Sequence, residues 1–322
     1  MSHEHKALAA EHRIALAEAL EAPTLHALET LYIEMSYETP QNHSYQTALA
    51  HDPDYPHGDS LNLAVFKLAQ RSLRELYLGE SWPISSAIWG ACDGISESLF
   101  PYLKIVHVDF PLITYDGGWL YTGNPDDARV WGALSPQSPL LDPGSDLDSN
   151  SPFNPEHAEK IYPGYHNMEG NGDHPWHEWR VHPDPEIFHP ILAAMANAVL
   201  RMPNLEHLRL RLVPNIDWCC SGGSNEPMES TRHFDICLNY LHGEHLTPIL
   251  PLCYRVGRPE KPKWIVESGL EGIWEIPEDI RDIMKQAVGE DGKVFMLDPE
   301  ADVRATLGPD VIAIIERGRS LL

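Results

Sequence analysis

Four short segments of the chain share one hydrophobic pattern: an apolar residue, two variable residues, a second apolar residue, one variable residue and a third apolar residue. They are residues 28–33, 73–78, 103–108 and 205–210. In each segment the last two apolar residues alternate with a residue of another kind, which is the period of a β-strand with one buried face. A strand that recurs with the same buried positions predicts a repeated structural layer.

Helical spacing precedes at least two of these segments. Residues 61–72 carry apolar residues spaced for one helical face, and the second strand segment follows directly. Residues 185–202 form the clearest helix, with Asp184 as its cap and Pro203 as its end. A helix followed by a short strand, repeated, predicts an α/β protein. We expect an irregular stack of helix–strand units that resembles a degenerate leucine-rich-repeat solenoid.

The chain of 322 residues is expected to contain three regions. These are an N-terminal helix in residues 1–24, a leucine-rich-repeat-like α/β region in residues 25–270 and a C-terminal βα cap in residues 271–322. Such a cap closes the end layer of a stack, which otherwise exposes apolar surface. Residues 134–160 are rich in Pro, Asp and Ser and cannot bury much apolar surface, so they are predicted to form a long polar insertion. Further helices are predicted at 6–21, 84–99 and 277–288.

The net charge of −25, from 23 Lys and Arg against 48 Asp and Glu, restricts the partners. Nucleic-acid binders neutralise phosphates with basic residues, so we expect no nucleic acid and no membrane partner, whereas a basic protein would be attracted. No apolar run approaches the ~18 residues of a membrane span, and the start of the chain lacks a secretory signal. Five cysteines without a Cys-x-x-Cys pair indicate a reducing compartment, so a cytoplasmic or nuclear location is expected.

Three further patterns have a common likeness. Residues 99–108 place an apolar-Pro-x-Leu sequence before a strand, residues 116–123 read Asp-Gly-Gly-Trp-Leu-Tyr-Thr-Gly, and residues 188–205 form an Ala-rich helix that ends in Met-Pro-Asn-Leu. Together they resemble the C-terminal, degenerate leucine-rich-repeat region of fungal F-box-like proteins, over about residues 60–215. The resemblance implies a substrate-recognition module. Residues 1–24 are too short for an F-box module, so assembly with a Skp-type ubiquitin-ligase adaptor is not expected.

Aromatic residues that follow the strand segments are the candidate partner-binding residues: Trp82, Trp89, Trp119, Tyr121 and Trp218. Loops after parallel strands lie on one edge of a sheet, so these rings are expected to line a groove for a protein or peptide, with a bias toward basic partners. The leading hypothesis is therefore a non-enzymatic protein-interaction module. The alternative for these rings is that they cover the ends of the hydrophobic core.

A fungal metabolic enzyme, which performs a tailoring or cyclisation step in a pocket on the same scaffold, is the alternative function. Asp116 and His107 are its candidate catalytic residues. His174, His177 and His182 only superficially resemble a zincin motif, because the last two are five residues apart and not four. We therefore expect no metal. No glycine-rich phosphate-binding motif is present in the sequence, and no cofactor is expected.

Overall fold

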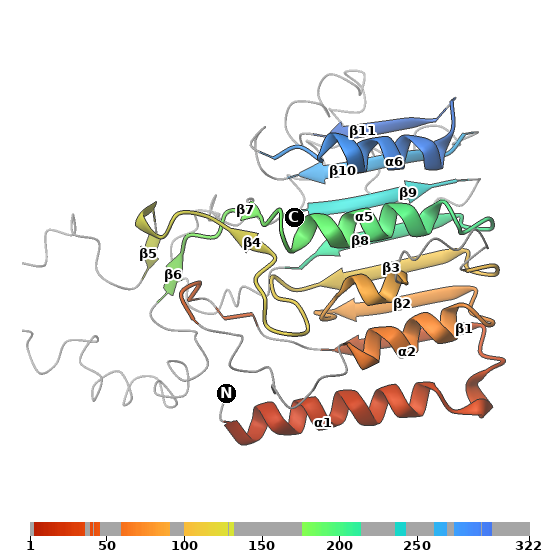
Figure 1. The fold of residues 1–322 in the computed structure, drawn as a ribbon, viewed down its shortest axis with the longest axis horizontal. Coiled ribbons are helices and arrows are strands. Elements are labelled where there is room, and N and C mark those ends of the chain that lie inside the picture. Colours follow the sequence, from red (N-terminus) through yellow and green to blue (C-terminus); the bar gives the residue numbers. More distant parts are fainter. Residues whose placement is uncertain are drawn as a thin grey trace, which may run out of the picture.

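The computed structural model describes residues 3–35, 39–40, 42–45, 59–90, 100–127, 129–131, 176–213, 236–242, 261–268, 274–290 and 292–297. The fold is α/β, with a seven-stranded, mostly parallel sheet in the order β1-β2-β3-β8-β9-β10-β11 (Figure 1). Its strands are β1 (Thr30–Met35), β2 (Glu75–Glu80), β3 (Ile105–Phe110), β8 (His207–Leu212), β9 (Ile236–Leu241), β10 (Lys263–Ser268) and β11 (Lys293–Leu297). The α-helices are α1 (His3–Leu20), α2 (Ser60–Ala69), α5 (Phe188–Val199) and α6 (Glu278–Val288).

Shorter elements lie beside this sheet. The 3-10 helices are η1 (Pro23–Leu25), η3 (Ser86–Trp89) and η4 (Pro125–Asp127). Two small antiparallel sheets join β4 (Tyr121–Thr122) to β7 (His182–Pro183) and β5 (Arg129–Trp131) to β6 (Trp176–Glu178).

The four segments with the shared hydrophobic pattern form the neighbouring parallel strands β1, β2, β3 and β8. Their central apolar residues lie in one row, with Leu31 beside Leu76, Leu76 beside Val106, and Val106 beside Leu208. All four side chains are at most 8% exposed. The prediction of an α/β protein in which these patterns form adjacent strands is therefore confirmed, whereas the resemblance to a leucine-rich-repeat solenoid stays a prediction.

The junctions before these strands repeat one hydrogen-bond arrangement. The carbonyl oxygen of Glu29 accepts from the backbone N–H groups of Arg74 (2.7 Å) and Glu75 (3.1 Å), and the carbonyl oxygen of Arg74 accepts from those of Lys104 (2.8 Å) and Ile105 (3.1 Å). The carbonyl of Lys104 repeats the arrangement with the start of β8. The parallel pairing of these strands therefore begins at equivalent positions of the sequence pattern.

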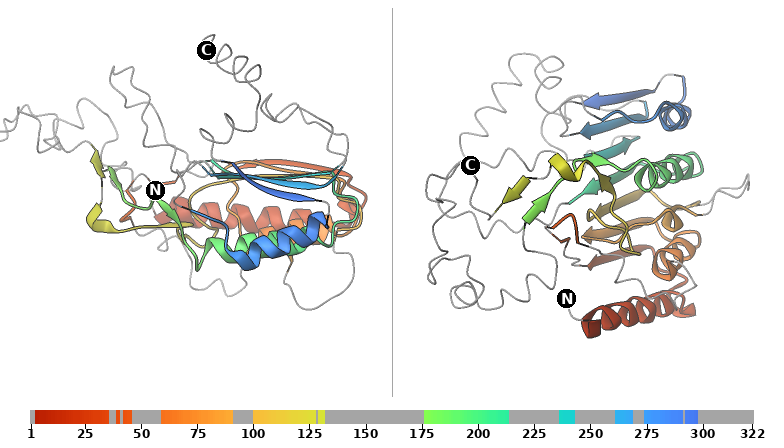
Figure 2. Two further views of the ribbon diagram at one scale, coloured as in Figure 1. Left: turned by 90° about the horizontal axis from the view of Figure 1, so that it is seen from above. Right: turned by 60° about the vertical axis from the view of Figure 1, so that its left-hand side comes forward.

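The helices of the described part cover one face of the sheet (Figure 2). Each of β2, β3 and β8 is added on the same side of its predecessor, and connections between parallel strands are almost always right-handed. Successive crossovers therefore fall on the same face. We call the opposite face of β1, β2, β3 and β8 the outer face. Its side chains alternate with those of the core and include Tyr32, Glu34, Tyr77, His107, Asp109, His207, Arg209 and Arg211.

The remaining strands extend this sheet with a change of direction. β9 is antiparallel to both β8 and β10, whereas β11 is parallel to β10. α6 and β11 match the helix and strand expected in residues 271–322, and they pack onto the same sheet. The boundaries of the three expected regions stay predictions.

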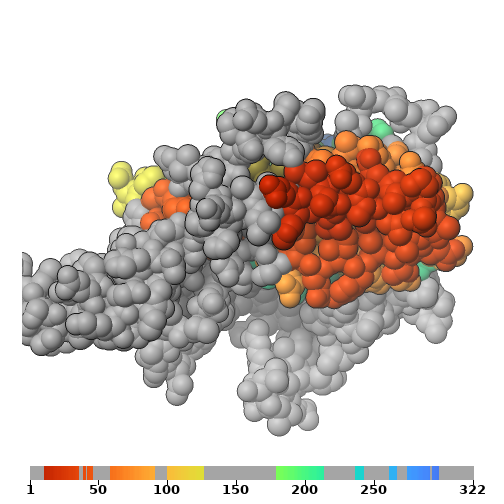
Figure 3. Space-filling model, turned by 90° about the horizontal axis from the view of Figure 1, so that it is seen from below, coloured from red at the N-terminus to blue at the C-terminus, as the bar shows by residue number. Residues whose placement is uncertain are grey.

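Most of the predicted helices are present. The ranges 6–21 and 61–72 overlap α1 and α2, each of which begins earlier than expected, and α1 lies at the surface in the view from below (Figure 3). In residues 185–202, α5 follows a turn in which the Asp184 carboxylate accepts from two backbone N–H groups at 2.8 and 3.2 Å. The helix expected over 84–99 differs, because residues 84–90 form only the 3-10 helix η3, which ends where Gly90 adopts a φ of +81°. The insertion predicted at 134–160 lies outside the described residues.

Candidate functional site

The structure places four of the five candidate binding aromatics in the hydrophobic core. Trp82 and Tyr121 are 0% exposed, Trp89 is 2% exposed and Trp119 is 7% exposed. Trp218 lies outside the described residues. A partner on the surface cannot reach rings buried to this degree. The burial of these four rings agrees with the alternative interpretation, in which they cover the ends of the hydrophobic core.

Trp119 has a specific structural role. Its ring lies 5.0 Å from the guanidinium of Arg180, which also stacks 4.1 Å over the ring of Trp179. The same guanidinium donates hydrogen bonds to the carbonyl oxygens of His43 (3.1 Å) and Tyr121 (3.0 Å). Cation–π contacts and these hydrogen bonds hold distant parts of the chain together around Trp119.

The two candidate catalytic residues have different surroundings. The Asp116 carboxylate accepts hydrogen bonds from the Thr114 hydroxyl and, at 3.4 Å, from the backbone N–H of Gly118, so it stabilises a turn. His107 lies on the outer face of β3 and lines a hollow to which Asp116 does not contribute. The structure therefore does not bring these two residues into one pocket.

The histidines of the zincin-like segment are only partly described. His182 lies half-buried in β7, the side chain of His177 in β6 is outside the described residues, and so is all of His174. Among the described side chains, no group of three or more His, Cys, Asp or Glu has the proximity that a metal site needs.

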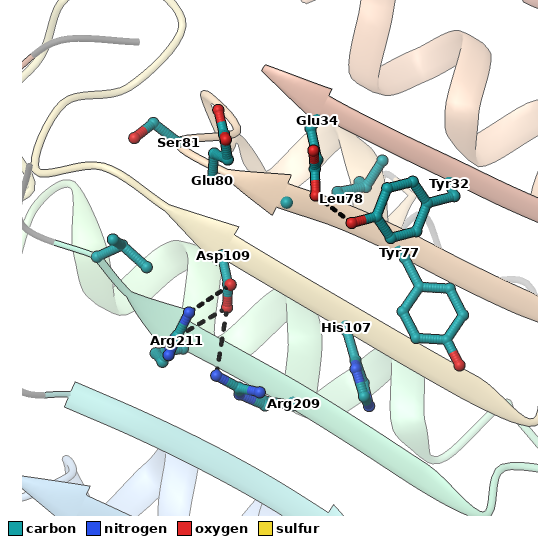
Figure 4. A pocket seen from close by; sticks show the side chains of 12 residues that line it. Tyr32, Glu34, Tyr77, Leu78, Glu80, Ser81, His107, Asp109, Arg209 and Arg211 are labelled. Carbon is teal, nitrogen blue, oxygen red and sulfur yellow. Dashed lines mark hydrogen bonds and ion pairs between the residues drawn. The ribbon is translucent and has the colours of Figure 1, made fainter. Parts of the chain in front are cut away.

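A hollow of about 550 Å³ opens on the outer face, over β1, β2, β3 and β8 (Figure 4). It is lined by Tyr32, Glu34, Tyr77, Leu78, Gly79, Glu80, Ser81, His107, Asp109, Arg209, Arg211 and Val213. Gly79 on β2 forms its floor. On one side Gly79 pairs in register with Glu34 of β1. On the other side lies β3, where Asp109 directly follows Val108, the register partner of Leu78. An added Cβ at Gly79 would lie 3.0 Å from Cγ of Glu34. Because Gly79 has no side chain, the Glu34 side chain can lie across it.

Rings form one wall of the hollow. Tyr32, Tyr77 and His107 are register partners on three adjacent strands. The centroids of Tyr32 and Tyr77 lie 6.0 Å apart, and the rings of Tyr77 and His107 meet edge to face at 4.9 Å. The row continues to His207, whose ring centroid is 4.6 Å from that of His107. Tyr32 is 63% exposed and His107 only 8%, so the row runs from the surface into the protein.

The charges of the hollow are divided between two sides. On one side, Asp109 accepts hydrogen bonds from Nε (3.1 Å) and Nη2 (2.6 Å) of Arg211 and lies 3.7 Å from Arg209. On the other side, the Glu34 carboxylate accepts a hydrogen bond from the Tyr32 hydroxyl. In the described part of the chain, neither Glu34 nor Glu80 forms an ion pair.

The negative side of the hollow affects the phenol beside it. The hydrogen bond to Glu34, followed by desolvation and by the charges of Glu34, Glu80 and Asp109, raises the pKa of Tyr32 above its usual value. Glu80 is also the only non-glycine residue of the described part with a left-handed backbone, at a φ of 62°. Such conformations are uncommon for residues with a side chain and occur at functional sites.

Two buried histidines lie at the closed end of the ring row. Nε2 of His107 and Nδ1 of His207 are 2.9 Å apart and share one hydrogen bond. Burial, with smaller contributions from His207 and Arg209, lowers the pKa of His107 to about 3. Burial also lowers the pKa of His207 to about 4, although the nearby Asn239 side chain acts in the opposite direction. Both imidazoles are therefore neutral at pH 7.

Apart from His107, the residues of the outer face were not identified from the sequence, although a signal for them exists. Tyr32, Tyr77, His107 and Arg209 each occupy the variable position between the second and third apolar residues of the four shared patterns. In a strand with one buried face, this position points to the opposite face.

Comparison with known proteins gives no family, no curated protein and no solved structure that matches this chain. No helix within the described ranges combines the length and apolar character needed to cross a membrane.

Proposed function

We propose that this protein is a non-enzymatic interaction module that binds a basic protein segment on the outer face, around the hollow. The observation that carries the proposal is a hollow floored by Gly79 and edged by the 63% exposed ring of Tyr32, on a sheet face without helices in the described part. Exposed tyrosines are frequent anchors in protein interfaces. The net charge of −25 favours a basic partner.

The layered architecture also supports a binding role. Repeat proteins present extended binding surfaces, and here one position of the repeated pattern supplies Tyr32, Tyr77, His107 and Arg209 to the same face. This arrangement agrees with the proposed relationship to the degenerate leucine-rich-repeat region of fungal F-box-like proteins. On that relationship the outer face would correspond to a substrate-recognition surface. A Skp-type adaptor is not part of the proposal.

The chemistry of the hollow favours binding over catalysis in a fungal tailoring or cyclisation enzyme. A pKa of about 3 makes His107 a weak base at pH 7, whereas a general base needs a pKa close to the working pH. Asp109 is engaged by a bidentate hydrogen bond with Arg211. The two groups best placed for acid–base chemistry are therefore poorly suited to it.

The experiment compares capture by the full-length chain and by two tyrosine variants. Tyr32 and Tyr102 are 63% and 52% exposed, and only Tyr32 lines the hollow. Immobilised wild-type, Tyr32→Ala and Tyr102→Ala proteins are incubated with a fungal lysate, and bound proteins are quantified by mass spectrometry. We expect a partner with a basic surface that Tyr32→Ala retains about tenfold more weakly and that Tyr102→Ala retains fully. Capture of no protein by the wild-type chain, or equal capture by both variants, would overturn the proposal.

A further inference from the structure

We propose that the side of the hollow between Tyr32, Glu34 and His107 is a subsite for one cationic side chain, lysine or arginine, of the partner. This inference rests on the proposed function, because it assigns a ligand group to the same outer face. It goes further in naming the chemical group that is recognised and the protein atoms that recognise it.

The charged groups of the hollow give the first argument. The cations already present, Arg209 and Arg211, face Asp109, which accepts two hydrogen bonds from Arg211. Glu34 and Glu80 form no ion pair within the described ranges. Ionised carboxylates are hydrogen-bond acceptors only. A group that fills this side must therefore donate hydrogen bonds, and a positively charged donor gives the stronger interaction.

The buried histidine pair gives a second, independent argument. The Asn239 amide NH₂ donates to Sγ of Cys237 at 3.3 Å. Oδ1 of Asn239 and Nε2 of His207 are both buried without a hydrogen-bond partner of ordinary geometry, yet Asn239 lies close enough to raise the pKa of His207. Nδ1 of His207 is engaged with His107, and Oδ1 of Asn239 can only accept a hydrogen bond, so we assign the proton of neutral His207 to Nε2.

This proton position fixes the state of His107. Neutral His207 with its proton on Nε2 has a lone pair on Nδ1, which accepts from Nε2–H of His107 at 2.9 Å. Neutral His107 then has a lone pair on Nδ1. That atom makes no hydrogen bond to the described residues, although His107 is 8% exposed and lines the hollow. This assignment gives the lining of the hollow a further acceptor, which the hydrogen bond to His207 holds in place.

The rings and the floor complete the subsite. Tyr32 and Tyr77, with centroids 6.0 Å apart and planes inclined by 40°, offer π-faces beside the carboxylates. Aromatic faces attract ammonium and guanidinium groups when these lie within about 6 Å of the ring. Because Gly79 has no side chain, the Glu34 side chain can lie across the floor of the hollow, with its Cγ 3.0 Å from the place of an added Cβ.

The test uses a fluorescein-labelled octalysine peptide, titrated with the full-length protein at low salt and followed by fluorescence anisotropy. Glu34→Gln removes the carboxylate charge, and Gly79→Val fills the floor without a change in charge. Glu18→Gln, on the exposed side of α1, removes the same charge away from the hollow. We expect Glu34→Gln and Gly79→Val to weaken binding about fivefold and Glu18→Gln to have no such effect. Thermal melting establishes that each variant is folded.

A different outcome would overturn the subsite. Octalysine can also bind to a protein of net charge −25 through long-range attraction alone. In that case Glu34→Gln and Glu18→Gln weaken binding equally, and Gly79→Val has no effect. This result would overturn the subsite but not the proposed function. The proposed function is tested separately, by the weaker capture of the partner by Tyr32→Ala, and that experiment does not use octalysine. Failure of the proposed function, in contrast, removes the difference between Tyr32→Ala and Tyr102→Ala.

Discussion

The paired histidines His107 and His207 predict that the folded state loses stability when the pH falls below 6.5. Their pKa values are about 3 and about 4 in the folded protein, against 6.5 for an unperturbed histidine. Below pH 6.5 the unfolded chain binds protons at these positions and the folded chain does not. The unfolded state is therefore favoured progressively as the pH is lowered, until the folded-state pKa values are reached.

The size of the effect follows from the structure. Because both folded-state pKa values lie below 5, the loss between pH 7 and pH 5 hardly depends on their values. It depends only on the protonation of the unfolded chain, and amounts to about 2 kcal/mol for each histidine. The pair is thus expected to account for about 4 kcal/mol of acid destabilisation.

Urea unfolding at pH 7.0, 6.0 and 5.0 measures this loss for the wild-type chain and for a His107→Gln, His207→Gln double variant. The variant is expected to be less stable at pH 7 but to lose about 4 kcal/mol less between pH 7 and pH 5. His12→Gln, which changes an exposed histidine on α1, is expected to follow the wild-type curve. If the double variant and the wild-type chain have the same pH dependence, then the imidazoles are not buried in neutral form and the assignment of the ring row is refuted.

Three further predictions concern stability measured by chemical denaturation. Asn62→Ala is expected to cost about 2–3 kcal/mol, because the buried Asn62 amide accepts from Nε1 of Trp82 at 2.6 Å, which is left without a partner; a loss below about 0.5 kcal/mol contradicts this role. Gly90→Ala is expected to cost clearly more than Gly289→Ala, because both have a positive φ but only at Gly90 would an added Cβ meet an aromatic carbon, at 2.6 Å; equal losses contradict it. Leu208→Ala, at a fully buried position in the middle of the sheet, is expected to lower the free energy of unfolding by about 2–5 kcal/mol. A loss below about 0.5 kcal/mol, as at an exposed position, contradicts the burial of Leu208 in this strand register.

The strands of the repeated layers could be predicted because their signal is local. Leu31, Leu76, Val106 and Leu208 occupy the same place in one short pattern, and equivalent places become register partners in the sheet. β9 and β10 were not predicted. Neither follows a helical segment in the pattern of the other layers, and β9 runs antiparallel to its neighbours. An interpretation that searches for the repeated sequence pattern does not find strands whose sequences lack that pattern.

The site was harder to predict because it depends on which strands are neighbours. The hollow exists where Gly79 lies between Glu34 and Asp109, residues that are far apart in the sequence. The aromatic candidates show the opposite difficulty. A tryptophan after a strand, such as Trp82, has the same local sequence whether it lines a groove or seals the core, and only the packing of the layers places it at 0% exposure.

Site-specific photocross-linking tests most directly the central claim that the outer face around the hollow binds a basic partner. p-Benzoylphenylalanine introduced in place of Tyr32 is predicted to cross-link to the captured partner, at a segment that contains lysine or arginine. The same group in place of Tyr102, which is exposed outside the hollow, is predicted to give no such product. Cross-linking from position 102 alone, or from neither position, would contradict the account.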